Sequence, residues 1–263
     1  MNSSRTNGLP LQARRLALLA LLVAAAPATW AQTAMKAVGV FSLLGDSVQV
    51  AVSTEAPKDT LIERTDRYAF EAKGIGFDNI ALRALRDALQ KAQPQAQVDL
   101  YKAPTALSPE EQRAIAEGAA SAELPAWIVQ TIDAKRLSHV ILVTRNRGDM
   151  NIRTNDNVSL GRGSAMGIGY YIDTLYAVRN PVNGEVSTGA LAPYVHVKLT
   201  LMDAQSGAVL QTYNMREGRL LGFGESKVST DPWTYLTAEQ KVATLRRYFE
   251  ENMVRAARDL LNR

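Results

Sequence analysis

A serine, two histidines and the lack of cysteine limit the chemistry that this chain can perform. Ser47 follows Gly45 and Asp46 after an apolar run, and the only histidines are His139 and His196. A serine nucleophile needs a base within hydrogen-bond reach, and neither histidine stands in a motif that would place it there. The sequence contains no cysteine, which excludes a cysteine nucleophile, a thiolate metal site and any disulfide.

The block Gly45-Asp46-Ser47 resembles the nucleophile block of the GDS-type esterases. That family carries an Asp-x-x-His block near its C-terminus, and here the residues three before the histidines are Arg136 and Pro193. The residues after Ser47 also alternate as a strand, where the esterases continue into a loop and a helix. We therefore interpret the block as the tip of a tight β-hairpin. A hydrolase with an unrecognised site stays as one alternative function.

Two further fragments are typical of short-chain dehydrogenases. Residues 163–169 match the GxxxGxG spacing, and residues 194–198 match the YxxxK spacing. A dinucleotide loop leads from a strand into a helix whose N-terminus meets the pyrophosphate, whereas Tyr170 to Ile172 is strand-like. Tyr194 and Lys198 lie in an alternating strand and do not share a helical face. We therefore expect no enzyme activity, no cofactor and no metal, with both histidines as ordinary strand residues.

The polar segment over residues 146–166 is the candidate binding site of the sequence. It is a loop rich in Gly, Asn and Arg, in which Arg147-Gly148-Asp149 is interpreted as a turn. Polar loops at the ends of a sheet commonly carry binding sites. The alternative is a solvated loop without a binding role. The candidate binding residues are Arg145, Arg153, Arg162, Tyr170 and Tyr171.

The N-terminal segment predicts export from the cytoplasm. Arg14 and Arg15 precede an apolar stretch over residues 16–26, and small residues follow up to Ala31. This pattern predicts a Sec-type signal peptide over residues 1–31, cleaved near Ala31, and a periplasmic or secreted protein. The apolar stretch is shorter than the ~20 residues of a membrane span, and no later run is longer. An uncleaved anchor and a twin-arginine signal are the alternatives.

The charge of the remaining chain is close to neutral. Residues 1–31 contain three arginines and no acidic residue, so their removal takes the net charge from +4 to +1. A nearly neutral protein gives no reason to expect nucleic acid or an anionic membrane as a partner.

Residues 32–263 are predicted to form a single α/β domain. We expect a mixed β-sheet, partly parallel and with antiparallel hairpins, packed by about four helices with a long one at the C-terminus. Predicted strands cover residues 37–44, 47–53, 67–72, 98–101, 139–145 and 167–178, and predicted helices begin at Asp78, Ser108, Pro125 and Thr237.

A further hairpin is predicted around the turn over residues 203–207. Apolar residues alternate from Val195 to Leu201 before the turn, and a second alternating run follows it, which predicts two strands with one buried face. At Asp203, Ser206 and Gly207 this segment resembles the periplasmic α/β domains of the curli-secretion lipoprotein family and of the amino-terminal part of the Tol–Pal β-propeller protein. The resemblance implies a non-enzymatic cell-envelope protein with a mixed sheet packed by helices. We predict a binding or assembly role in the envelope, for which an envelope protein is a candidate partner. A small-molecule-binding periplasmic protein is the alternative, and the oligomeric state stays open.

Overall fold

The structure is a computed structural model, and part of the chain is described in it. The described residues are 35–54, 64–72, 74–105, 107–108, 111–112, 114–115, 124–150, 152–153, 159–161, 163–179, 186–221 and 231–262. The predicted signal peptide over residues 1–31 lies outside them.

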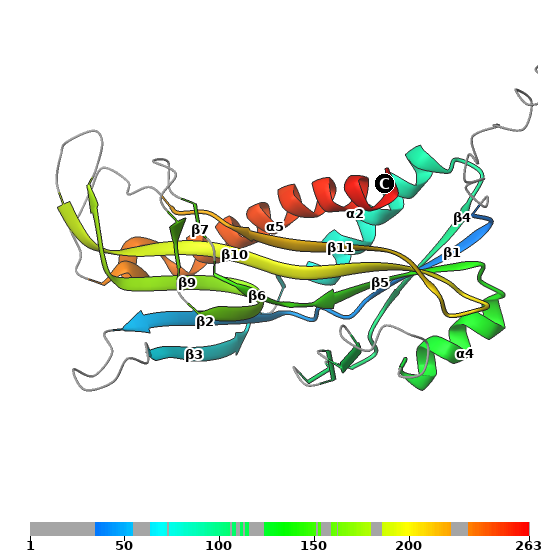
Figure 1. Cartoon of the computed structure of the whole chain (residues 1–263), viewed down its shortest axis with the longest axis horizontal. Coiled ribbons are helices and arrows are strands. Elements are labelled where there is room, and N and C mark those ends of the chain that lie inside the picture. Colours follow the sequence, from blue (N-terminus) through cyan, green and yellow to red (C-terminus); the bar gives the residue numbers. More distant parts are fainter. Residues whose placement is uncertain are drawn as a thin grey trace, which may run out of the picture. The chain divides into compact units, whose positions relative to one another are not determined.

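A mixed sheet of nine strands organises the described residues (Figure 1). The strands are β1 (Ala37–Ser42), β2 (Ser47–Thr54), β3 (Arg64–Glu71), β4 (Gln97–Lys102), β5 (His139–Arg145), β6 (Arg147–Asp149), β9 (Ser164–Arg179), β10 (Val186–Asp203) and β11 (Val209–Gly218). Their order is β3-β2-β9-β10-β5-β1-β4, with β11 paired to β10 and β6 paired to β9. Strands β7 (Ile152–Arg153) and β8 (Ser159–Leu160) form a separate small sheet.

The long strand β10 is the axis of this sheet. Its first part pairs with β9 and its last part with β5, both antiparallel, while β11 runs antiparallel along its other side. The predicted hairpin after Leu201 is therefore confirmed. Its turn is held by Asp203, whose Oδ1 accepts hydrogen bonds from the Ser206 amide and hydroxyl, both at 2.7 Å.

The prediction that this hairpin buries only one face is wrong for β10. His196 and Thr200, on the supposedly open face, are 2% and 3% exposed. Two clusters cover this face: a second layer, in which Met150 and Ile152 pack with Tyr194, lies over the first part of β10, and the cluster beneath helix α4 (Ala126–Lys135), which contains Leu142 and Met202, covers its last part. The segment expected to be a polar loop thus supplies core residues, and its Arg147-Gly148-Asp149 is strand β6 rather than a turn.

The tight hairpin predicted at Gly45-Asp46 is also wrong. Strand β1 pairs in parallel with β5, and β2 pairs in parallel with β9. Since β5 and β9 follow one another along β10, the chain continues forward from β1 into β2 without reversing. The segment between β1 and β2 is held by hydrogen bonds to Asp78, at the start of the following helix. The Asp78 carboxylate accepts from the Leu44 and Gly45 amides at 3.0 and 3.2 Å.

Three α-helices have described bounds, rather than the expected four or so: α2 (Phe77–Ala92), α4 (Ala126–Lys135) and α5 (Ala238–Leu261). The helix predicted from Ser108 is described only at residues 111–112 and 114–115, where it is helical. Its predicted capping box forms, because the Ser108 amide donates to Glu111 at 2.7 Å and the Glu111 amide donates back to the serine hydroxyl at 3.2 Å. A short 3-10 helix, η1 (Pro232–Tyr235), precedes α5.

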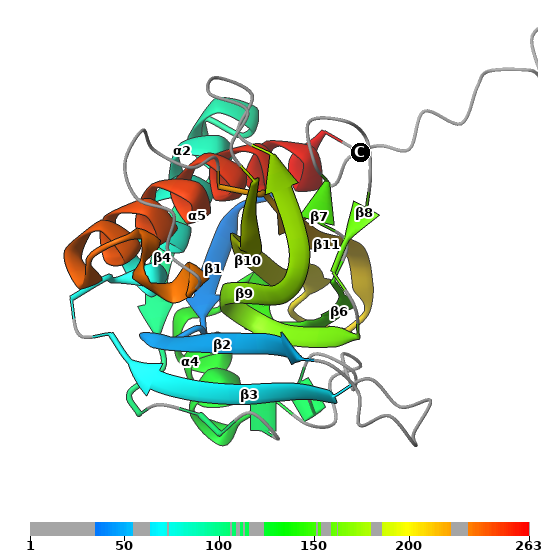
Figure 2. The ribbon, with the colours of Figure 1, turned by 90° about the vertical axis from the view of Figure 1, so that its left-hand side faces the viewer.

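The helices cover the two faces of the sheet unequally. Helices α2 and α5 lie side by side on one face and form the main core with β1, β2, β5, β9 and β10 (Figure 2). Helix α4 packs on the other face through Ile128, against Phe41 and Leu142. No helix among the described residues has both the length and the apolar character that a membrane crossing requires.

Candidate functional site

Arg145, the first of the predicted binding residues, lies inside the protein at the end of β5. Its side chain is 4% exposed. Its Nε donates to the Leu44 carbonyl and one Nη to the Ser47 carbonyl, each at 2.6 Å. Burial lowers the pKa of Arg145, and Tyr194 and Asp78 act in the opposite direction. The guanidinium therefore stabilises the segment between β1 and β2 through hydrogen bonds. No sequence pattern reveals this role.

The two predicted tyrosines lie on opposite faces of β9. Tyr170 packs in the main core and Tyr171 in the second layer, and both are 1% exposed. Arg162 lies outside the described residues, and Arg153 is described only as backbone of β7. The described members of the predicted set are therefore not gathered at one surface, and a binding role for the set stays a prediction.

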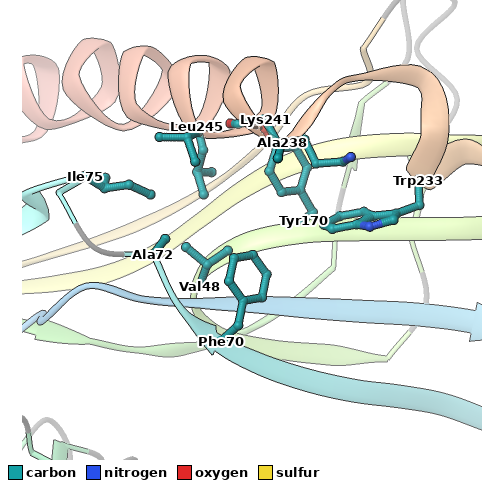
Figure 3. Close-up of a pocket in the computed structure, with 10 residues that line it drawn as sticks. Val48, Phe70, Ala72, Ile75, Tyr170, Trp233, Ala238, Lys241 and Leu245 are labelled. Carbon is teal, nitrogen blue, oxygen red and sulfur yellow. Dashed lines mark hydrogen bonds between the residues drawn. The ribbon is translucent and has the colours of Figure 1, made fainter.

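One of these residues, Tyr170, lines a pocket of about 320 Å³. The pocket lies between the start of α5, helix η1 and the β2–β3 part of the sheet (Figure 3). Phe70 and Val242 are 43% and 36% exposed, so the pocket opens to solvent on their side. The lining residues are Val48, Phe70, Ala72, Ile75, Tyr170, Trp233, Ala238, Lys241, Val242 and Leu245.

Local sequence features explain how η1 and α5 come to form the wall of this pocket. Asp231 caps η1 by accepting from the Trp233 amide at 2.9 Å. Thr237 and Gln240 form the predicted capping box that starts α5, with bonds of 3.2 and 2.9 Å. Gly189 of β10 has a φ of +102°, and a Cβ there would stand 2.3 Å from a carbon of Pro232. Glycine at this position therefore lets η1 lie directly on the sheet.

The polar atoms of the pocket come from Tyr170, Trp233 and Lys241. The Tyr170 hydroxyl donates to the main-chain carbonyl of Lys241 at 2.6 Å, and burial raises the pKa of this phenol, so it stays uncharged. Lys241 Nζ donates to the Leu236 carbonyl at 2.6 Å and lies 4.3 Å from the centre of the Trp233 ring. Burial lowers the pKa of Lys241, and Asp231 acts in the opposite direction. The pocket thus pairs apolar walls with a single cationic side chain.

The two histidines, which are common catalytic and metal-binding residues, are absent from the pocket lining. His139 and His196 lie in strands as predicted, and their Nδ1 atoms bond to Ser138 Oγ and the Ala165 carbonyl, each at 3.0 Å. Burial lowers the pKa of both histidines. In the part of the chain that the structure describes, no group of three His, Cys, Asp or Glu side chains could hold a metal ion. The lining of the pocket contains no nucleophile paired with a base.

Sequence reasoning missed most of the pocket. Val242 of α5 lines the pocket, and its 36% exposure shows that this end of the helix faces a hollow. Phe70 and Trp233 are far apart in the sequence, so no local sequence pattern indicates that they line the same pocket. Tyr170 was predicted as a binding residue on other grounds, because it follows the polar segment over residues 146–166.

Comparisons with known proteins find distant matches among solved structures. No protein-family model matches the chain, and no curated protein matches it. Among solved structures, a PelC dodecamer variant from Paraburkholderia phytofirmans covers 87% of this chain and 90% of its own, at 14% identity and a TM-score of 0.31. The match to a homologue of a neuraminyllactose-binding hemagglutinin from Helicobacter pylori covers 86% of both chains, at 10% identity and a TM-score of 0.40. The match to a Xanthomonas campestris protein of the DUF330 family covers 86% of this chain and 81% of that protein, at 8% identity and a TM-score of 0.32.

All three TM-scores are below 0.5, so nothing about the function of this chain follows from them. The resemblance of the β10–β11 hairpin to curli-secretion and Tol–Pal domains gains no support from a family match and stays a prediction.

Proposed function

We propose that this chain is an exported, non-enzymatic protein of the cell envelope that binds a small, largely apolar molecule in the pocket at the start of α5. Export rests on the signal-peptide pattern of residues 1–31. Binding rests on one observation, the 320 Å³ pocket that opens beside Phe70 and is lined by apolar side chains with few polar atoms. Small-molecule sites in proteins have volumes of about 300–1,000 Å³ and the same mostly apolar lining.

Binding of an uncharged fluorescent probe tests this proposal. N-phenyl-1-naphthylamine, whose emission rises in apolar surroundings, should bind the protein saturably with one site. The substitution Ala238→Trp should fill the pocket and weaken this binding at least about tenfold, because Ala238 lines the pocket from the exposed start of α5. Ala243→Trp is the matched control, since Ala243 is exposed on the same helix and is absent from the lining. Probe binding that is undetectable, or equal in both variants, would refute the proposal.

An assembly role is the second candidate function, and strand β3 favours it. Among the described residues β3 pairs only with β2, so it lies at an edge of the sheet. Its Tyr68 is 60% exposed next to Phe70 of the pocket rim. An edge strand with exposed aromatic side chains is a common place for a partner strand to add. Crosslinking from a photoreactive residue placed at position 68 in envelope fractions would identify such a partner, and the absence of any crosslinked protein would argue against it.

A further inference from the structure

We infer that the ligand of this pocket is a free amphipathic anion with a single apolar chain, whose chain lies against Ile75 and Leu245 and whose anionic group meets the Lys241 ammonium. This inference rests on the proposed binding function and specifies its ligand class. It is drawn from how the apolar and charged groups divide the pocket.

The apolar end of the pocket is built from side chains that belong to the main core. Val48, Ile75 and Leu245 are 1%, 2% and 1% exposed, and they form this part of the pocket together with Ala72 (Figure 3). None of these side chains carries a polar atom. A hydrocarbon group is therefore the chemistry that fits here, since transfer of apolar surface out of water into an apolar environment is favourable.

The other end of the pocket carries the cation. Figure 3 shows Lys241 and Trp233 together on the side away from Ile75. An ammonium group has three N–H donors. One donates to the Leu236 carbonyl, and the face of the Trp233 ring lies 4.3 Å from the nitrogen. A ligand oxygen can accept from a remaining donor, and a negatively charged oxygen is favoured because charge-assisted hydrogen bonds are the stronger ones.

The acidic groups near Lys241 among the described residues are few. In the described part of the chain, Asp231 is the acidic residue that acts on the charge of Lys241, and its Oδ1 already accepts from the Trp233 amide as the cap of η1. Among the described residues, no carboxylate forms an ion pair with Lys241. Partial burial lowers the pKa of the lysine, which means that its charged form lacks some of the stabilisation it has in water. An anionic ligand would supply that stabilisation.

The size of the pocket distinguishes a free acid from a membrane lipid. At 320 Å³ it lies at the lower end of the range of small-molecule sites, about 300–1,000 Å³. One chain of medium length is compatible with this volume, whereas the two acyl chains of a phospholipid are not. Octanoate is therefore a suitable probe, because it joins a single chain to one carboxylate.

Calorimetric titration of the whole exported chain tests this inference with three probes of one chain length. Octanoate should bind at least about tenfold more tightly than octan-1-ol, and octyltrimethylammonium should bind more weakly than the alcohol. In Lys241→Met the octanoate affinity should fall to that of octan-1-ol, while octan-1-ol binding should change less than about twofold. Lys241→Arg should keep the preference for the acid, which separates the charge from the role of the lysine in folding.

Lys91→Met is the matched control, since Lys91 is an exposed lysine in the last turn of α2 and is absent from the pocket lining. It should bind all three probes as the wild type does. Equal affinities for octanoate and octan-1-ol in the wild type would overturn the inference and leave the proposed function standing. Failure of octanoate, octan-1-ol and N-phenyl-1-naphthylamine alike would remove the proposed function itself.

Discussion

Replacement of Arg145 by methionine should destabilise the fold and leave the pocket unaffected. Arg145 was predicted as a binding residue, yet its guanidinium donates two hydrogen bonds of 2.6 Å to carbonyls of the β1–β2 junction. A buried carbonyl left without a donor costs about 1–3 kcal/mol. Leu44 is buried and Ser47 is half-buried, so the two carbonyls together cost about 2–5 kcal/mol.

Loss of the buried charge offsets part of this cost, because one Nη of Arg145 is buried without a hydrogen-bond partner. We therefore expect the free energy of unfolding to fall by about 2–4 kcal/mol. Urea denaturation followed by circular dichroism measures it, and the midpoint should fall by roughly 1 M or more.

The control for Arg145 is Arg147→Met on β6. Arg147 is exposed, and its Nε donates to Ser164 Oγ at 2.8 Å, so its replacement should change the free energy of unfolding by no more than about 0.5 kcal/mol. An Arg145→Met variant as stable as the wild type would show that the guanidinium is not needed at the junction. Probe binding lost in a folded, stable Arg145→Met variant would return the residue to a binding role.

Two further predictions concern η1 and the buried histidine. Gly189→Ala should lower the free energy of unfolding by at least about 2 kcal/mol and weaken probe binding, because the new Cβ would displace Pro232 and with it Trp233. The control is Gly45→Ala, which should lower the free energy of unfolding by only about 1 kcal/mol, because Gly45 has a φ of +61° and its Cβ would meet nothing within 4 Å. Equal losses of stability in the two variants on denaturation would contradict this prediction. Burial lowers the pKa of His196 below 6.5, so the unfolded chain binds its proton more readily and stability should decline as the pH falls below about 6.5. His196→Gln should reduce that decline in urea titrations across pH, and an unchanged slope would refute it.

The elements with local signals were predicted well. The β10–β11 hairpin follows from strict alternation around Asp203, and α5 begins at the capping box of Thr237 and Gln240. Strand β5 has the predicted bounds and is buried along its whole length, as its continuous apolar run indicates. These features depend on neighbours a few residues away, so the sequence contains the information directly.

The errors share a different cause. Gly45-Asp46 suits a tight turn, but whether the chain reverses there depends on which strands β1 and β2 find as partners, and these are β5 and β9. Likewise, the second face of β10 is covered because Met150 and Ile152 pack on its first part and the cluster beneath α4 packs on its last part. Alternation alone indicates which side chains share a face, and it does not reveal how many faces become covered.

The amino-acid sequence alone shows which reactive side chains this protein has. Without cysteine and with two histidines in strands, it specifies a fold held by apolar burial and main-chain hydrogen bonds. The position of the pocket depends on tertiary structure, because its lining joins Phe70, Tyr170, Trp233 and Lys241 from separate parts of the chain. Tertiary structure also gave each charge its role: it placed Arg145 against buried carbonyls, and it set the ammonium of Lys241 at the end of an apolar pocket.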